Sequence, residues 1–147
     1  MKQIGVIGSS HCDEKLYSIA YNVGRLIAER GWILINGGLW GVMEASAKGA
    51  KENGGIVVGI LPGGKGNVNP YIDIKIATNM YHARNMIIVY SADALIAIGG
   101  EYGTISEMAI ALKENKTVVA IEPNVVLDGL RIAKSAEEAI DIIENIG

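Results

Sequence analysis

The residues with the clearest chemical potential lie in one stretch, where an apolar run breaks into glycines and restarts as a helix. Residues 94–98 are all apolar, as a strand buried on both faces requires. Gly99, Gly100 and Gly103 follow closely, and glycines let a backbone pass near a ligand because they carry no Cβ. The expected helix directs free N–H groups and the positive end of its dipole at the same place. This stretch therefore predicts a site for an anion such as phosphate.

Two charged side chains are candidates to act at this site. Glu107 lies one turn inside the expected helix and faces its N-terminal end. Thr104 and Glu107 also fit a capping box, with Thr104 as the cap and Glu107 as the third helical residue, and the two interpretations do not exclude each other. Arg84 leads into an apolar segment, where an unpaired charge is costly. We expect it to pair with Glu101, Glu107 or a ligand phosphate.

A further turn follows the first apolar run. Residues 8–10 read Gly-Ser-Ser, and their amides and hydroxyls either contact a nucleotide or form a tight turn in which Ser10 or Asp13 caps the next helix. The G-x-G-x-x-G spacing of a dinucleotide fingerprint is missing. The second strand ends in Asn36, where an acidic residue is needed to hold a ribose. An NAD-linked dehydrogenase is therefore disfavoured.

Residues 59–66 come within one residue of a P-loop. Gly66 stands where Ser or Thr would bind magnesium, and residues 67–70 cannot begin the helix that such a loop needs. We therefore reject ATPase or GTPase activity for this segment. Residues 62–70 are interpreted as a mobile loop over the site, with Lys65 close to an anion.

The composition favours a single globular domain. The chain has 147 residues, of which 50% are hydrophobic, and a formal charge of −3, so it can bury a core without disulfides or a metal. The lack of a basic excess argues against nucleic acid as a partner. Cys12 is the only cysteine, and the cysteine count indicates no metal site. Without a visible signal peptide or an apolar run of about 20 residues, we expect no membrane partner and a cytoplasmic location.

Strand and helix patterns alternate along the chain. The expected strands are residues 2–8, 32–36, 56–61, 72–77, 94–98 and 117–121. The expected helices are residues 13–30, 39–52, 79–91 with Asn79 as cap, 103–115, and 135–144 with Ser135 as cap. This alternation predicts one Rossmann-like three-layer α/β/α domain over residues 1–147, with a mainly parallel sheet. Ligands of such sheets bind at the carboxyl ends of the strands, near the switch point, where all the glycine turns meet.

Together these motifs resemble the LOG-like family, long labelled lysine-decarboxylase-like, over residues 4–120. Residues 8–10 with Tyr17 resemble the family's G-S-S…Y motif, and residues 37–43 resemble its G-G-x-x-G-x-M motif. Residues 59–62 resemble its G-V-I-P motif. Residues 82–84 match the H-x-R of its M-H-x-R-K motif, and residues 100–107 lie over its P-G-G-x-G-T-x-x-E motif. Some members of that family hydrolyse the base–ribose bond of nucleoside 5′-monophosphates. The resemblance therefore implies a nucleotide-binding protein. Decarboxylase activity has no support in these residues, because no lysine lies in a recognisable pyridoxal phosphate motif.

The family's catalytic pair falls on Arg84 and Glu107. The resemblance implies that Glu107 holds ribose hydroxyls and stabilises an oxocarbenium-like transition state, while Arg84 fixes the substrate and keeps that carboxylate ionised. The glycine turns and the resemblance together give the expected ligand- and phosphate-binding residues: Gly8, Ser9, Ser10, Gly37, Gly38, Met43, Gly99, Gly100, Tyr102, Gly103 and Thr104. No cofactor and no metal ion are expected.

Three positions depart from the family pattern. In an ungapped match the family's Pro and second Gly are Gly99 and Glu101, and the Lys after its Arg is Asn85. Glu101 places a negative charge beside the proposed phosphate loop. A related branch, which the chain also resembles, contains the molybdenum cofactor carrier proteins, which bind a phosphorylated pterin without turning it over. Glu101 and Asn85 weaken the hydrolase hypothesis and leave the carrier hypothesis untouched.

Two functions thus remain open from the sequence. The first is a phosphoribohydrolase that cleaves the N-glycosidic bond of a nucleoside 5′-monophosphate. The alternative is a non-catalytic carrier or sensor of a phosphorylated pterin or nucleotide. In both cases we expect a homodimer or a higher homo-oligomer with its contact near residues 79–91, because the second half of that segment is apolar on every side.

Overall fold

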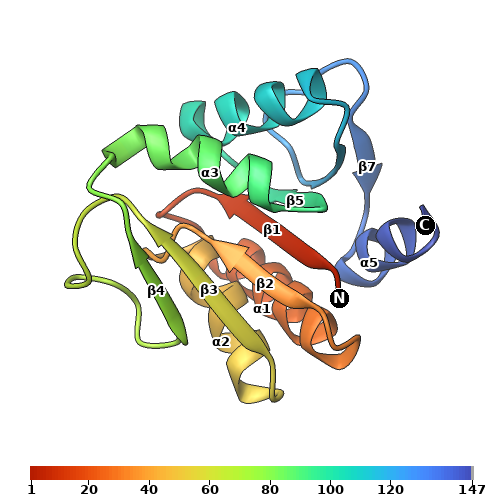
Figure 1. The fold of residues 1–147 in the computed structure, drawn as a ribbon. Coiled ribbons are helices and arrows are strands. Elements are labelled where there is room, and N and C mark those ends of the chain that lie inside the picture. Colours follow the sequence, from red (N-terminus) through yellow and green to blue (C-terminus); the bar gives the residue numbers. More distant parts are fainter. Residues whose placement is uncertain (147) are drawn as a thin grey trace.

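The computed structural model describes residues 1–146, which form an alternating series of strands and helices (Figure 1). The strands of this part of the chain are β1 (Gln3–Gly8), β2 (Ile33–Asn36), β3 (Ile56–Leu61), β4 (Ile74–Ala77), β5 (Ala94–Ile98), β6 (Thr117–Ile121) and β7 (Arg131–Ala133). The helices are α1 (Glu14–Glu29), α2 (Val42–Glu52), the short 3-10 helix η1 (Tyr81–Ala83), α3 (Arg84–Ser91), α4 (Tyr102–Lys113) and α5 (Ala136–Glu144).

The strands form one parallel sheet in the order β4-β3-β2-β1-β5-β6-β7. From β1 the chain builds outward to β4 and then returns to place β5 on the other side of β1. The switch point therefore lies between β1 and β5. Gly8 pairs with Ile98 in register, so both strands end at the same level. The predicted Rossmann-like α/β fold with a parallel sheet is confirmed.

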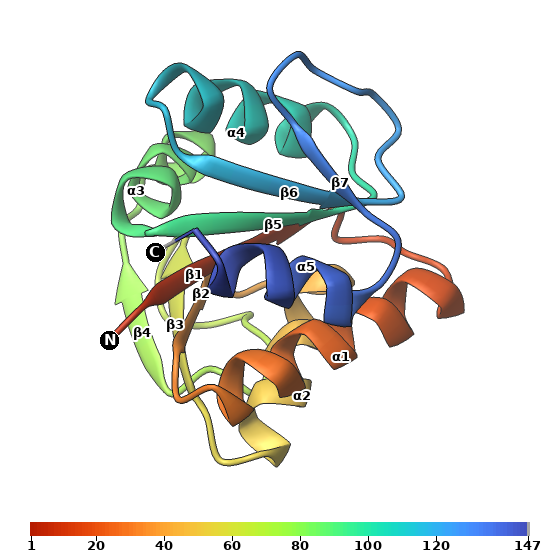
Figure 2. The same cartoon turned by 90° about the vertical axis from the view of Figure 1, so that its right-hand side faces the viewer.

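Helices cover both faces of the sheet, as the continuously apolar strands require. Figure 2 shows α1, α2 and α5 on one face and α3 and α4 on the other. In β1, side chains alternate between these faces: Ile4 and Val6 pack in the core under α1, whereas Ile7 packs in the core under α3 and α4. In residues 1–146, no helix has both the length and the apolar character needed to span a membrane.

Ser135 is confirmed as a helix cap, and of the two caps considered for the first turn, Ser10 and Asp13, the structure has Asp13. Asp13 caps α1 by accepting a hydrogen bond from the Leu16 amide at 2.9 Å, and Ser135 caps α5 by accepting one from the Glu138 amide at 3.1 Å. These side chains satisfy amides that no helical carbonyl can reach. The predicted strand over residues 72–77 begins at Ile74. The prediction missed β7, because three largely exposed residues carry no strand pattern.

The predicted helix over residues 79–91 is wrong in its first turn, and Asn79 does not cap it. Asn79 has a φ of +52° and Tyr81 a φ of +50°, a left-handed conformation that is uncommon outside glycine. The Tyr81 amide donates to the Pro62 carbonyl at 2.9 Å, and the Asn79 amide donates to the Gly63 carbonyl at 3.3 Å. These contacts hold the segment beside the end of β3, and α3 begins only at Arg84.

Candidate functional site

A cavity of about 410 Å³ opens at the carboxyl edge of the sheet, at the switch point between β1 and β5. Its walls come from the ends of β1 and β2, the first turn of α2, and the N-terminal halves of α3 and α4. The predicted site residues that line it are Gly8, Ser9, Ser10, Gly37, Met43, Arg84, Gly103, Thr104 and Glu107. Blocks far apart in the sequence thus meet around one space.

Arg84 opens α3, and its side chain is buried in the cavity wall. Its Nε donates a hydrogen bond to the Ile60 carbonyl at 3.0 Å, and its Nη1 donates one to Asn85 Oδ1. Gly37 lies against the other end of the guanidinium, where an added Cβ would come within 2.7 Å of Nη2. The hydrogen bonds of residues 1–146 leave the remaining N–H groups of Arg84 without a partner, so a ligand can accept them.

Glu107 lies one turn further along α4 than the cavity mouth and is only 7% exposed. Across residues 1–146, no hydrogen bond uses its carboxyl group, and no side-chain oxygen or nitrogen is both buried and unpartnered. The Glu107 oxygens must therefore open on the cavity. Burial raises the pKa of Glu107 to about 8, although nearby Arg84 lowers that pKa in part.

The expectation that Arg84 keeps Glu107 ionised is therefore wrong for the structure as it stands. Desolvation penalises the charged carboxylate, and it outweighs the attraction of the guanidinium. Burial likewise lowers the pKa of Arg84, which Glu107 raises in part. Among residues 1–146, neither Arg84 nor Glu107 takes part in an ion pair. Two of the partners predicted for Arg84, Glu101 and Glu107, form no such pair with it, and the third, a ligand phosphate, stays a prediction.

The first turn of α4 presents unsatisfied amides to the cavity. Glu101 is the N-cap residue, with an extended backbone, and no side chain caps the helix. The Ile105 amide donates to the Glu101 carbonyl at 2.9 Å, so the amides of residues 102–104 precede the helical hydrogen bonds. Free amides at the positive end of a helix dipole attract anions. The predicted capping box is wrong, because Thr104 is the third helical residue rather than the cap.

Buried polar contacts fix the turn after β2. Asn36 is fully buried; its Nδ2 donates to the Met43 carbonyl at 2.9 Å, and its Oδ1 accepts from the Gly38 amide at 2.8 Å. These bonds tie the end of β2 to the start of α2. Gly37 therefore faces the cavity, and a Cβ there would lie 2.8 Å from Met43 Sδ.

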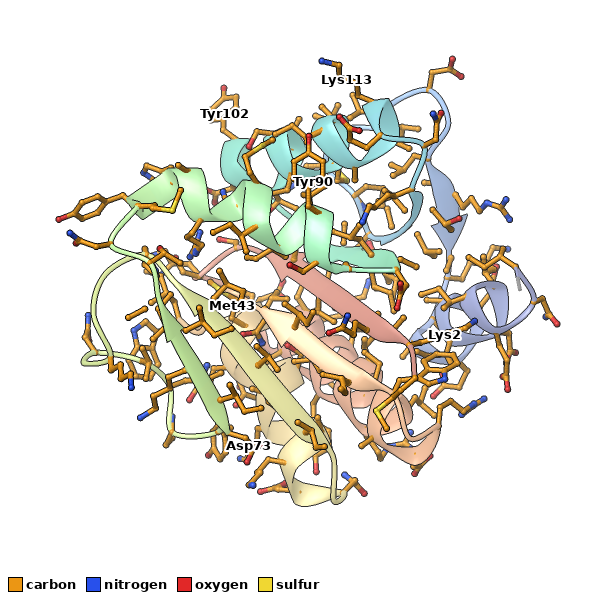
Figure 3. All side chains as sticks on the ribbon, viewed as in Figure 1. Lys2, Met43, Asp73, Tyr90, Tyr102 and Lys113 are labelled. Atoms are coloured by element: carbon orange, nitrogen blue, oxygen red, sulfur yellow. The ribbon has the colours of Figure 1, made fainter. Side chains whose placement is uncertain are left out.

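Four of the predicted site residues do not line the cavity. Gly38, Gly99 and Gly100 have φ values of +76°, +56° and +112°, so they shape the turns behind it. A Cβ on Gly100 would lie 2.5 Å from Thr104 Cγ2. Tyr102 is 90% exposed and points away from the sheet (Figure 3). The structure thus separates the glycines that bend the chain, and the outward side chain of Tyr102, from the residues that line the cavity.

The loop of residues 62–70 reaches the cavity only through Pro62. Lys65 is exposed and does not line it. The far end of the loop is fixed, because the Asn69 amide donates to the Gly38 carbonyl at 3.0 Å and Asn69 Nδ2 donates to the Leu39 carbonyl at 2.8 Å. The expectation that Lys65 lies close to an anion has no support in this geometry.

Several lining residues were not among the predicted ligand-binding residues. Tyr81, His82 and Asn85 line the cavity, as does Glu101, which the sequence placed beside the expected phosphate loop. Pro62 follows the end of β3 and lines the cavity, as the switch-point rule predicts for the turn after this strand. No local pattern predicts Tyr81, because its position depends on the left-handed turn that precedes α3.

Comparisons with known proteins match the fold over nearly the whole chain. A model of the SLOG cluster4 family matches residues 1–145. The solved structure of a molybdenum cofactor binding protein from the phototrophic bacterium Rippkaea orientalis superposes with a TM-score of 0.94 at 39% identity, covering 99% of this chain and 96% of that one. The molybdenum cofactor carrier protein of Chlamydomonas reinhardtii gives a TM-score of 0.90 at 35% identity, covering 98% of this chain and 97% of that one.

A second group of similar proteins carries a different activity. The cytokinin riboside 5′-monophosphate phosphoribohydrolase of Mycobacterium tuberculosis is 29% identical over an alignment of 153 positions. This alignment covers 90% of this chain and 82% of that protein. The similar proteins therefore include both carriers and hydrolases, the two functions that the sequence motifs left open.

Proposed function

From the premise that the chain belongs to the SLOG cluster4 family, we propose that it binds a phosphorylated small molecule at the carboxyl edge of its sheet and carries it without turning it over. The favoured cargo is a phosphorylated pterin. The similar solved structures of a molybdenum cofactor binding protein, at 39% identity, and of a molybdenum cofactor carrier protein, at 35% identity, support this choice.

One observation carries the proposal: hydrogen-bond donors of α3 and α4 that have no partner in the described chain converge on one cavity. The amides of residues 102–104 have no cap, and Arg84 keeps N–H groups that no residue of the described chain accepts. Charge-assisted hydrogen bonds to an anion are about twice as strong as neutral ones. A phosphate group at the start of α4 satisfies both sets of donors.

The cavity suits a ring compound attached to that phosphate. Its volume of about 410 Å³ falls within the range of small-molecule sites, roughly 300–1,000 Å³. Leu39, Met43 and Ile88 supply apolar surface on its walls. Such walls favour a flat heterocycle, since polar groups then need only fix its orientation.

Residue 102 offers a direct test of the phosphate contact, because its side chain is exposed and its backbone amide donates no hydrogen bond within the helix. Proline is favoured as the first residue of a helix, and Glu101 already has the extended backbone that a residue before proline requires. Tyr102→Pro therefore removes one N–H without disturbing α4. We expect its affinity for inorganic phosphate to fall about tenfold or more, as for a lost charge-assisted hydrogen bond, by calorimetric titration.

Tyr102→Ala is the matched control, because it removes the same side chain and keeps the amide. It should bind phosphate as tightly as the wild-type protein. Equal affinities in the two variants would contradict a phosphate at the start of α4. Mass spectrometry of the small molecule released from freshly purified protein tests the cargo, and a pterin phosphate is the expected result.

A second function is favoured by one specific observation: Arg84 and Glu107 both open on the cavity, as a phosphoribohydrolase needs. This chemistry requires an ionised carboxylate against a developing positive charge. Because the pKa of Glu107 is raised to about 8, any hydrolysis should become faster as the pH rises through 8. Chromatographic detection of free base from a panel of nucleoside monophosphates at pH 6, 7.5 and 9 tests this. Release of base that Glu107→Gln abolishes would replace the carrier function by the hydrolase function.

A homodimer in contact along α3 is also part of the proposal. Tyr90 on α3, and Met80 and Tyr81 just before it, are 54%, 47% and 67% exposed. Large exposed apolar side chains on and beside one helix favour an interface. Light scattering should give twice the monomer mass for the wild-type protein and the monomer mass for Tyr90→Glu, and a monomeric wild-type protein would refute this contact.

A further inference from the structure

We propose that Asn85 reads the ring of the bound molecule and selects a ring edge that presents a carbonyl oxygen over one that presents an amino group. This inference rests on the proposed function, because it assigns a second contact to the same phosphorylated ligand. It concerns a position where the chain has Asn in place of the Lys expected from the LOG-like pattern.

The amide of Asn85 has a fixed orientation. Its Oδ1 accepts a hydrogen bond from Arg84 Nη1. A guanidinium has N–H donors and no acceptor, so only the oxygen of the amide can face it. The oxygen and nitrogen of an amide are usually hard to tell apart, but the chemistry of this partner decides the assignment. Arg84 is held in turn by its Nε bond to the Ile60 carbonyl at 3.0 Å.

The NH₂ group of Asn85 is consequently directed away from Arg84 and is free to bind a ligand. No hydrogen bond of residues 1–146 uses Asn85 Nδ2, and Asn85 is a lining residue that is only 8% exposed. Within the same residues, no side-chain nitrogen is fully buried without a partner. Nδ2 therefore opens on the cavity, where it needs an acceptor once a ligand displaces water.

The surroundings of Asn85 favour a ring over a second phosphate. The phosphate is assigned to the amides of residues 102–104 on α4 and to the remaining N–H groups of Arg84, whereas the NH₂ group of Asn85 is directed away from Arg84. Ile88, three residues further along α3, lines the cavity with apolar surface. A heterocycle against Ile88 presents its polar edge to the Asn85 NH₂. An oxo group accepts that N–H, while an amino group leaves two donors facing each other.

Inosine and adenosine 5′-monophosphate form a matched pair for the test, because at ring position 6 one has a carbonyl and the other an amino group. We expect the wild-type protein to bind the inosine nucleotide about tenfold more tightly or better, as expected when buried donors are left unpaired. Asn85→Asp keeps an oxygen toward Arg84 and replaces the NH₂ by an acceptor, so the preference should vanish or reverse. Asn85→Ala should lose the preference without reversing it.

The ratio of the two affinities is the measured quantity, because changes in charge affect both nucleotides alike. Glu101→Gln changes the charge at the cavity mouth and should leave the ratio unchanged. Equal ratios in wild-type and both Asn85 variants would show that Asn85 only positions Arg84, and would overturn the inference. Failure of both nucleotides to bind at millimolar concentration also overturns it, yet leaves the proposed function intact if the purified protein releases a phosphorylated pterin.

Discussion

The two edges of the sheet both hold a cavity lined by charged side chains, but they use those charges in opposite ways. At the amino edge the cavity measures about 250 Å³. There, Lys116 Nζ donates to the carbonyls of Tyr90, at 3.0 Å, and Ala92, and Lys2 Nζ donates to the Ile143 carbonyl at 3.1 Å. Each lysine thus satisfies carbonyls at the C-terminal end of a helix, where cations are favoured.

At the carboxyl edge the charged groups are buried more deeply and are satisfied less completely. Arg84 and Glu107 are 8% and 7% exposed, respectively, yet neither forms an ion pair within residues 1–146. Keeping such groups buried is costly for the fold, because Arg84 carries a desolvated charge and Glu107 must hold a proton to avoid one. Ionisable side chains that are bonded to the backbone at the amino edge therefore stabilise the fold, whereas the polar atoms that Arg84 and Glu107 leave free around the cavity are those that a ligand can satisfy.

The largest effect is expected in the pH dependence of stability, and it comes from Glu107. Its pKa is 4.5 in the unfolded chain and about 8 in the folded protein. Between these values the unfolded chain releases a proton that the folded protein keeps, so stability falls as the pH rises. Glu107→Gln should remove this slope and exceed the wild-type stability at pH 8 by roughly 3–5 kcal/mol.

Denaturant unfolding of both proteins at pH 5, 6.5 and 8 measures the effect, since the other titrating groups cancel in the difference. Asp93→Asn is the control at the opposite edge, where the Asp93 carboxylate accepts a hydrogen bond from the Gln3 amide at 2.8 Å. This variant should gain no stability at pH 8. Parallel pH profiles for wild type and Glu107→Gln would mean that Glu107 is not buried in a neutral form.

The next largest effect is expected at Arg84. Arg84→Met removes the unspent N–H groups and should lower the affinity for inosine 5′-monophosphate about a hundredfold, the scale of losing charge-assisted hydrogen bonds. It should also raise the pKa of Glu107 further, since Arg84 lowers that pKa in the wild-type protein. Titration calorimetry gives the affinity, and carboxyl NMR gives the pKa. An unchanged affinity would place the phosphate elsewhere.

Lys116 provides the converse test at the amino edge. Lys116→Met leaves the carbonyls of Tyr90 and Ala92 without their donor, so we expect a loss of about 1–3 kcal/mol in the free energy of unfolding. The affinity for the same nucleotide should not change, because this cavity lies at the opposite edge of the sheet. A variant that keeps its stability and loses affinity would reverse the roles assigned to the two edges.

Much of the carboxyl edge could be predicted from the sequence, because it depends on the order of the elements. Alternating strands and helices give a parallel sheet, and a parallel sheet brings the turns after Gly8 and Gly37 to the same edge. What could not be predicted depends on packing between distant segments. The raised pKa of Glu107 comes from its burial, and the orientation of Asn85 depends on its hydrogen bond with Arg84. Likewise, Glu101 replaces Thr104 as the cap because of the bend at the preceding glycines.

The smallest expected effect is at Glu101, whose charge at the carboxyl edge opposes an anionic ligand instead of binding it. Glu101 is an exposed acidic residue that lines the cavity mouth beside the free amides of α4. Its charge opposes an incoming phosphate, but solvent and salt screen an exposed charge. Glu101→Gln should therefore bind inosine 5′-monophosphate only about two- to fivefold more tightly at low salt, with the gain shrinking near 0.5 M salt. If the variant instead binds more weakly at every salt concentration, Glu101 contacts the ligand through a hydrogen bond that it accepts, and the cavity mouth selects a donor group as well as an anion.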